Sequence, residues 1–274
     1  MPTNEVNLLP SQVFFGIAIL AFVALVVMEK LHPYRRFTDK IVKESFLTNT
    51  TAFLFNNIIL TALRATSLFF VAQQFSSHGL LSSMSDNPIK WFITFLLYDL
   101  AIYFWHVISH HYVFLWRFHK VHHSDKSFNT STGFRFHVFD LFLEIIYKCL
   151  FVIIVGVKAD LVLAIESIQL FFIFFHHSNI SFKNEKLVSD FIITPYLHRV
   201  HHSTLRSEHD SNYGIVLAFW DKLFGTRKEL VPENIGLDIV VAENFLQLFF
   251  LAFITERHIK KVLNIIPKGR KSQR

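Results

Sequence analysis

The sequence of 274 residues has one cysteine, Cys149, which lies in an apolar run. A single cysteine excludes a disulfide framework and a zinc site built from thiolates. The metalloprotease motif HExxH, the haem-binding run His-Pro-Gly-Gly and the glycine-rich fingerprint of dinucleotide-binding folds are absent too. A Glu-x-x-His motif occurs once, at Glu29 to His32, whereas carboxylate-bridged di-iron bundles need it twice together with two further glutamates. A metal site in this chain must therefore use another set of ligands.

Apolar residues, in contrast, make up 52% of the chain, its mean hydropathy is +0.38, and 33 residues are phenylalanine. Soluble domains rarely reach this apolar content, which favours segments that cross a bilayer. Long apolar runs cover residues 13–28, 46–75, 91–108, 141–157 and 161–175. The connector between the last two runs is short enough for a helical hairpin. No basic region with a cleavage site precedes the first run, so we interpret it as an anchor helix and not as a signal peptide.

Basic residues between these runs predict how the chain is oriented. The segment from Lys30 to Lys43 is basic, residues 73–88 contain no Lys or Arg, and the segments after residues 108 and 175 are basic again. Residues 257–274 contain seven basic residues and no acidic one. We therefore predict a multi-pass integral membrane protein with its N-terminus outside and its C-terminus in the cytoplasm. The net charge of +6 then fits anionic lipid headgroups, and we expect no nucleic-acid partner.

Polar residues inside two apolar segments refine this topology. Asn49, Asn56, Asn57 and Arg64 lie in the second run, and we expect that helix to pack against other helices because lipid would not solvate them. Residues 239–254 are apolar as well, but three polar residues share one face of this segment. A further crossing would also place the basic tail outside. We therefore predict a helix that lies at the membrane interface.

Histidine is the second unusual feature, because 13 of the 16 histidines lie between His106 and His209. Three motifs hold most of them: HVISH at 106–110, HKVHH at 119–123 and HRVHH at 198–202. Positions i, i+3 and i+4 share one face of a helix, so we expect each motif to present two or three imidazoles in one direction. A single motif of this kind would indicate ordinary core or surface histidines. Three motifs on one side of a membrane predict a metal centre, and eight imidazoles suit two metal ions better than one.

Helical geometry predicts the roles of the polar residues near the three motifs. His111 and His176 adjoin the motifs but point about 100° away from them on a helix, so we predict that they are not ligands. Asp99 lies seven residues before His106 in an apolar run, where a carboxylate needs a partner. We predict that it accepts the remaining N–H of a ligand imidazole, the alternative being a plain helix–helix hydrogen bond. Weaker candidates for the same role are Asp140, Glu144, Asp210 and Asp221.

The three motifs, in this order, resemble those of the fatty acid hydroxylase (sterol desaturase) superfamily. The resemblance covers nearly half of the chain, from Asp99 to Thr226, and includes several shorter segments. These are Asn129, Arg135 to His137, Phe175 to Asn179, Thr194-Pro195, Asp210 to Gly214 and Trp220 to Thr226. Val138 is a departure, because bacterial members often carry proline there.

The resemblance implies an all-α fold, with a bundle of four or five transmembrane helices under a cytosolic, helical, histidine-rich cap that binds two non-haem irons. The implied ligands are His106, His110, His119, His122, His123, His137, His177, His198, His201 and His202. Catalytic roles are predicted for Asp99, Asn129 and Asp210. We expect membrane anchor helices in residues 1–90, the catalytic domain in 91–228 with a membrane hairpin at 141–176, and the interfacial helix and basic tail in 229–274.

The implied activity is the hydroxylation or desaturation of an unactivated C–H bond of a lipid, with O2 as co-substrate, on the cytoplasmic face. The Phe-rich helices would line an apolar slot for the lipid tail. Electrons must come from a separate donor, such as a reductase, a ferredoxin or a cytochrome b5, because the sequence has no haem, flavin or cluster motif. Alternatives are a zinc-dependent membrane hydrolase and a membrane transporter that binds divalent metals. The motifs do not select one lipid among fatty acyl, sterol, ornithine, carotenoid and ether lipids.

Overall fold

The structure is a computed structural model that describes residues 9–63, 68–237 and 242–254, with backbone only for residues 9–15. The described residues form helices and no strand beyond two isolated β-bridges, so the prediction of an all-α fold is confirmed. Two helices, α4 (Pro88–His111) and α7 (Ala159–His177), are long and apolar enough to cross a membrane. The predicted basic tail, Arg64 and part of the predicted interfacial segment lie outside the described residues.

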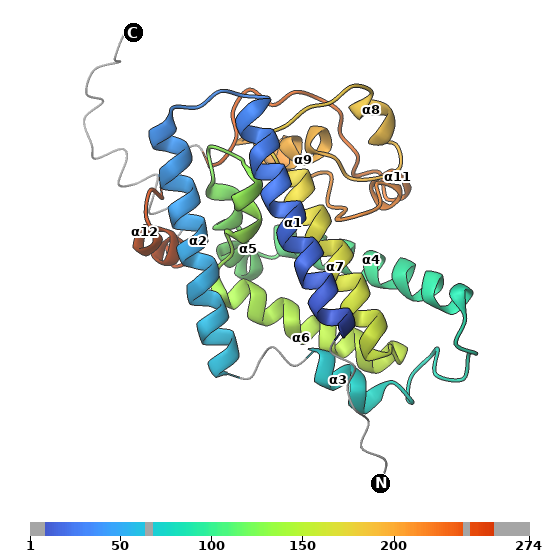
Figure 1. The fold of residues 1–274 in the computed structure, drawn as a ribbon. Helices are drawn as coiled ribbons and strands as arrows, with labels where there is room; N and C mark the ends of the chain where they lie inside the picture. Colours follow the sequence, from blue (N-terminus) through green and yellow to red (C-terminus); the bar gives the residue numbers. More distant parts are fainter. Residues whose placement is uncertain (1–8, 64–67, 238–241, 255–274) are drawn as a thin grey trace, which may run out of the picture.

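Two long helices open the chain, α1 (Leu9–Leu31) and α2 (Asp39–Ala62). Helix α1 packs along α7, while α2 packs against the 3-10 turn η2 (Thr130–Phe134), α6 (Val138–Val155) and α12 (Phe245–Leu251) (Figure 1). The carboxylate of Glu29, near the end of α1, accepts the backbone N–H groups of Thr130 and Asn179, each at 2.6 Å. This carboxylate therefore ties α1 to the segments that follow the second histidine motif and α7.

The second apolar run does not form one helix. Helix α2 ends at Ala62, and α3 (Leu68–Phe75) is a separate short helix. The prediction that polar residues bind other segments is confirmed for two asparagines: Asn49 binds Asp125, Ser131 and Arg135, and Asn56 donates to the Phe136 carbonyl. It is wrong for Asn57, which is exposed and donates to the Phe53 carbonyl of its own helix. An amide can satisfy itself one helical turn back and then needs no partner helix.

A short connector joins α6 and α7, as predicted, and we call it the hairpin turn. Helix α3 packs against both helices, but α6 and α7 do not pack along each other, so they are not paired along their length as a helical hairpin would be. Helix α6 ends at Gly156, whose φ of +78° is a left-handed conformation that favours glycine. A Cβ atom on Gly156 would lie 2.4 Å from the His78 carbonyl oxygen, so the loop of residues 76–87 approaches the hairpin turn closely. The backbone N–H groups of Leu80 and Leu81 also donate to the end of α6. The loop without Lys or Arg therefore lies at the hairpin-turn end of the molecule.

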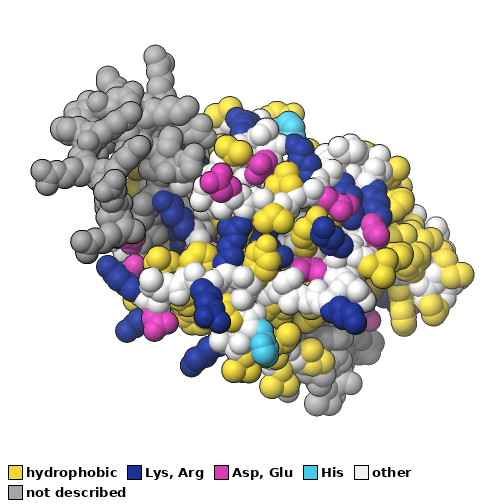
Figure 2. Space-filling view, turned by 90° about the horizontal axis from the view of Figure 1, so that it is seen from above, with side chains coloured by type: hydrophobic (Ala, Val, Ile, Leu, Met, Phe, Trp, Pro, Cys, Tyr) yellow, Lys and Arg dark blue, Asp and Glu magenta, His cyan; other side chains and the backbone are white. Residues whose placement is uncertain are grey.

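Short helices form much of the rest of the chain. Helix α4 continues into α5 (Val113–His119) and the 3-10 turn η1 (His122–Ser124), which precede η2. After α7 come α8 (Glu185–Val188), α9 (Pro195–His201), α10 (Arg206–His209) and α11 (Phe219–Leu223). Helices α8 and α9 lie at the end opposite the hairpin turn, and Figure 2 shows that many Lys and Arg side chains gather on this face.

Helix α12 falls within the predicted interfacial segment. The polar residues Asn244 and Gln247 do not form a polar face there but a cap. The Asn244 side chain accepts the Gln247 N–H, while Gln247 accepts the Glu243 N–H. Capping satisfies backbone donors that a helix leaves unpaired at its first turn. Leu248 and Leu251 are buried, and Leu246 is exposed, so the short helix is still amphipathic.

Large apolar side chains cover the outer faces of three long helices. Leu20 on α1 is 70% exposed, Ile58 on α2 is 68% exposed and Ile154 on α6 is 58% exposed. Several neighbours on the same helices are exposed as well. Contiguous apolar surface of this kind usually contacts lipid or another protein.

Candidate metal centre

Nine of the ten predicted ligand histidines converge in two groups, and all nine are buried. The first histidine group contains His106, His110, His119, His123 and His201. The second histidine group contains His122, His177, His198 and His202. Within each group the candidate ligand atoms all lie within 4.8 Å of one another. Residues far apart in the sequence, on α4, α5, η1, α7 and α9, therefore meet in one place.

Each motif presents two imidazoles to one group, as predicted, and each HxxHH motif sends its remaining imidazole to the other group. His198 and His202 face the second group, whereas His201 between them faces the first. Positions i and i+4 share a helix face, and the residue at i+3 is displaced far enough to turn to a neighbouring site. In the other motif α5 ends at His119, and the 3-10 turn that follows separates His122 from His123. The two sites are interleaved along the chain.

Hydrogen bonds orient the rings of five candidate ligands through Nδ1. The acceptors are carbonyl or carboxylate oxygens, a common arrangement around metal-binding imidazoles. They are Tyr213 O for His106 (2.7 Å), Asp210 for His110 (3.2 Å), Asp140 for His119 (3.0 Å), Ile173 O for His177 (2.7 Å) and Ser211 O for His201 (2.7 Å). A ring that donates from Nδ1 keeps its lone pair on Nε2. In the first group the Nε2 atoms of His106, His110, His119 and His201 are buried without a hydrogen-bond partner.

The second group has the spacing of a tetrahedral metal site. The Nε2 atom of His177 lies 3.0 Å from that of His122, 3.0 Å from that of His198 and 3.2 Å from that of His202. One ring nitrogen cannot share hydrogen bonds with three others. Imidazole nitrogens held at about 2.0–2.1 Å from one ion at tetrahedral angles lie roughly 3.3 Å apart. The chemistry and spacing of both groups therefore fit bound metal ions.

Burial and neighbouring charges keep five of the converging histidines neutral. Burial, followed by the charge of neighbouring histidines, lowers the pKa of His122, His123, His198, His201 and His202 well below the ordinary value of 6.5. Neutral imidazole is the form that binds metal. At physiological pH these residues therefore present lone pairs and no positive charge.

His137 is the one predicted ligand that neither group includes. It caps the N-terminus of α6, where its Nδ1 accepts the Phe139 N–H at 3.2 Å. Its ring lies among aromatic rings, with centroids 5.3 Å from Phe118 and 5.0 Å from Phe249. The adjoining Val138 is the first residue of α6, a position that proline also suits, so the departure from the family pattern leaves the helix start intact.

The predicted catalytic residues are placed differently from one another. Asp210 contacts a candidate ligand, His110. Asp99 does not: it accepts the N–H groups of Val216 and Leu217 and the indole N–H of Trp220. The prediction that Asp99 holds an imidazole is therefore corrected, because backbone and indole donors from a distant segment satisfy it. Asn129 caps η2 by accepting the Ser131 N–H, and its amide donates to Ser45 and Ser127 rather than to a histidine.

His111 and His176, which adjoin candidate ligands in the sequence, differ in their surroundings. His111 is exposed and bonds the Val107 carbonyl of its own helix, which agrees with its predicted position outside the ligand set. His176 is fully buried, with its ring centroid 3.9 Å from that of His198, so the prediction that it points away is wrong. Helix α9 packs against this end of α7, and the flank of α7 that carries His176 therefore faces protein too.

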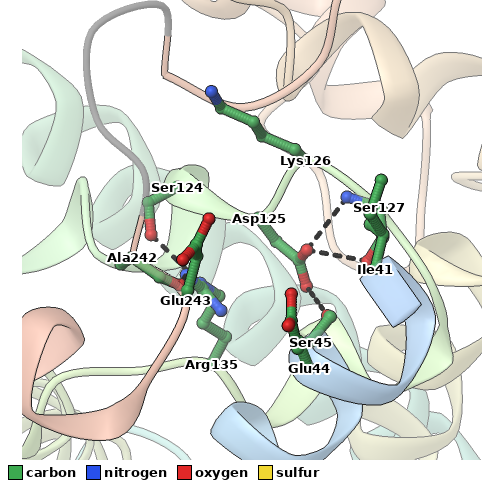
Figure 3. A pocket seen from close by; sticks show the side chains of 10 residues that line it. All are labelled: Ile41, Glu44, Ser45, Ser124, Asp125, Lys126, Ser127, Arg135, Ala242 and Glu243. Atoms are coloured by element: carbon green, nitrogen blue, oxygen red, sulfur yellow. Dashed lines mark hydrogen bonds between the residues drawn. The ribbon is translucent and has the colours of Figure 1, made fainter.

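Asp125 and Arg135 hold the segment of the second motif against α2. Asp125 accepts hydrogen bonds from Ser45 (2.8 Å) and Asn49 (2.9 Å), and Arg135 donates to the same Asn49 (2.8 Å). Burial would raise the pKa of Asp125, but the Arg135 charge and these hydrogen bonds outweigh it and lower the pKa. Ser45, Asp125 and Arg135 line a cavity of about 250 Å³ (Figure 3). The network satisfies the two charges internally and anchors the loop after His123.

A second cavity borders both histidine groups. Its apolar wall consists of Ile102, Trp105, Phe136, Ile173 and Ile215. Six histidines line it: His106, His119, His122, His176, His177 and His198. Two further polar residues, Glu144 of α6 and Gln169 of α7, complete the lining. Sequence reasoning passed over Gln169 and considered His176 only as a possible ligand, although two polar residues seven positions apart in an apolar helix indicate one shared face.

Comparison with known proteins agrees with this geometry. A protein-family model described as fatty acid hydroxylase matches residues 91–226. The ornithine lipid hydroxylase OlsE of Rhizobium tropici is 29% identical over 246 residues, which is 85% of this chain and 73% of that protein. Human alkylglycerol monooxygenase is 30% identical over 171 residues, which is 60% of this chain and 38% of that protein. Human cholesterol 25-hydroxylase is 29% identical over 144 residues, 51% of this chain and 52% of that protein.

The chain thus spans about half of the length of these two human relatives, or less. No solved structure shows a significant match.

Proposed function

The chain belongs to the fatty acid hydroxylase family, and from that premise we propose that it is a membrane oxygenase that hydroxylates or desaturates an unactivated C–H bond of a lipid. One observation carries the proposal: two groups of buried histidines with converging nitrogen atoms border a cavity whose walls are largely apolar. A site for a charged or highly polar substrate would need more polar groups in that wall.

We propose that each histidine group holds one iron, with the nine converging histidines as ligands. Iron bound there would supply the power to oxidise a C–H bond with O2. The protein's own share is positioning. Asp140 and Asp210 keep the rings of His119 and His110 in place, the apolar wall binds a hydrocarbon chain, and the closed site keeps water out.

Asp99 and Asp221 support the site indirectly in this proposal. Asp221 accepts the N–H groups of Tyr213 and Gly214, and the Tyr213 carbonyl in turn holds His106. Asp99 fixes the segment that follows, at Val216 and Leu217. Both carboxylates therefore position the loop that orients a candidate ligand.

The same proposal places the protein in a membrane. Helices α4 and α7 have the length and composition of membrane spans, and the exposed apolar faces of α1, α2 and α6 would contact lipid tails. The basic face near α8 and α9 would then lie on the cytoplasmic side, and the loop without Lys or Arg on the other. Residues 1–90 would anchor the chain, 91–228 would form the catalytic domain, and 229–274 would lie along the interface. A separate protein would deliver electrons.

The alternatives have less support. A zinc hydrolase needs one ion with an open position, whereas two complete groups of imidazoles are present among the described residues. A metal transporter would place its ligands along a path through the membrane, and these histidines lie together and buried.

The test combines metal analysis with lipid analysis. Protein purified without oxygen from iron-fed cells should contain two irons per chain. Membranes that contain the protein should accumulate a lipid shifted by +16 or −2 mass units relative to membranes with the His201→Ala variant. One metal per chain after full iron loading would contradict the two-site proposal. An unchanged lipid profile with two irons bound would contradict the oxygenase proposal.

A further inference from the structure

One side chain in the cavity has an unmet hydrogen bond. Gln169 of α7 is 3% exposed and lines the cavity, yet its amide nitrogen Nε2 has no hydrogen-bond partner. Burying an amide without a partner is costly, and native structures tolerate few such groups. A leucine would fill an apolar slot without this cost. An unpaired donor in the wall of a substrate cavity points to a partner on the substrate.

The position of Gln169 along α7 sets where that partner lies. Gln169, Ile173 and His177 occupy positions i, i+4 and i+8, and all three line the cavity. Gln169 is seven residues from His176, which is about 10 Å along the helix axis at the usual rise. The amide therefore lies at the end of the cavity away from the histidines, close enough for one short stretch of lipid to reach both.

An oriented acceptor also lines the cavity. Glu144 of α6 lines it, and Lys148 holds the Glu144 carboxylate at 2.8 Å. Lys148 is held in turn by Glu166 at 3.0 Å, which accepts the Tyr98 hydroxyl at 2.6 Å. Two carboxylates share one lysine, and each carboxylate can accept at both of its oxygens. Glu144 thus supplies an acceptor in the same cavity as the Gln169 donor.

We propose, as a refinement of the oxygenase function, that Gln169 and Glu144 bind the polar linkage of the lipid substrate and so determine specificity. The group that satisfies both residues accepts from the Gln169 amide and donates to the Glu144 carboxylate. A secondary amide or a hydroxyl does this, an ester satisfies Gln169 alone, and a plain hydrocarbon satisfies neither. The substrate is therefore a lipid with an amide or hydroxyl group, oxidised on a carbon a few bonds from that group.

The test measures binding, so that it does not depend on turnover. Three probes with the same number of carbon atoms differ in the linkage: N-methylhexadecanamide, methyl hexadecanoate and heptadecane. Their affinities for the full chain in detergent are measured by displacement of a fluorescent fatty-chain ligand, first with metal-free and then with zinc-loaded protein. We expect affinity to fall in the order amide, ester, hydrocarbon, with about a fivefold step for each hydrogen bond lost.

Two variants and a matched control connect the preference to Gln169. Gln169→Leu removes the donor, and we expect it to weaken amide and ester binding about fivefold while heptadecane binding stays the same or improves. Gln169→Glu keeps the shape of the side chain and should lose the same preference, so a folding defect of the leucine variant does not decide the outcome. Gln74→Leu makes the same change at an exposed glutamine of α3 and should leave the order unchanged.

Two results would overturn the inference. The first is equal binding, or no binding, of all three probes by the unchanged protein. The second is an amide preference that survives in both Gln169 variants. The proposed function fails separately: selective, Gln169-dependent amide binding without any oxidised product from the iron-loaded protein would refute the oxygenase and keep the binding site. If heptadecane were oxidised as readily as the amide, the oxygenase would be kept and the proposed binding of the polar linkage would be refuted.

Discussion

Replacing His201 by alanine removes one of the five converging imidazoles of the first histidine group. The ring is fully buried, its Nδ1 donates to the Ser211 carbonyl at 2.7 Å, and its Nε2 has no partner other than the proposed metal. Losing a residue that only orients a ligand typically costs 10- to 100-fold in metal affinity. Losing the ligand itself should cost more than about 100-fold. We therefore expect bound iron to fall from two per chain to about one and lipid oxidation to become undetectable.

His111→Ala is the matched control, because it removes the same side chain next to the same motif. His111 is exposed, and its one hydrogen bond, at 2.8 Å, goes to the Val107 carbonyl of its own helix. Exposed substitutions of this kind usually change stability by less than about 0.5 kcal/mol. Iron content and product formation should both stay above about half of the unchanged protein's values.

The assay quantifies iron by elemental analysis and product by mass spectrometry on the same membrane preparations, with protein amount normalised by immunoblot. Equal damage from both variants would refute the assignment of helix faces around His110. Full iron content in His201→Ala would refute the assignment of His201 as a ligand.

The remaining predictions concern topology and two buried carboxylates. A reporter inserted near Ser83 should be external and one fused after Arg274 cytoplasmic; two reporters on the same side would contradict the charge-based orientation. Asp99→Asn should lower the free energy of unfolding by about 1–3 kcal/mol, because its new N–H group faces backbone donors; iron loss at unchanged thermal stability would instead indicate contact with a ligand. Asp125→Asn should cost about 3–5 kcal/mol at pH 7, since it leaves Arg135 buried without its countercharge. The pKa of Asp125 is lowered in the fold, so its contribution is present above the ordinary value of 3.8 and is lost as the pH falls below it. The difference in unfolding temperature between the two proteins should therefore shrink on acidification, and a difference that grows would contradict the assignment.

Local patterns were enough to predict the chemistry of the site. Histidines spaced i, i+3 and i+4 are neighbours on any helix, so eight of the nine converging histidines could be named from the motifs without knowledge of the fold, and the family resemblance added His177. Apolar runs likewise predicted most of the long helices and the short connector between α6 and α7, because the period of a helix and the need to bury or cover apolar surface act over a few turns. The family resemblance rests on the same short segments.

Packing between distant segments decided which partner each polar group has. The end of α5 and the 3-10 turn after it send His122 and His123 to different groups, which spacing alone did not predict. Asp99 binds Trp220, 121 residues away, and no local rule selects that partner over a nearer imidazole. Gln169 and His176 became part of the cavity because α4 and α9 pack against α7. A hydrogen bond needs its two atoms within about 3 Å, and for residues distant in sequence that proximity is a property of the packed helices and not of the local sequence.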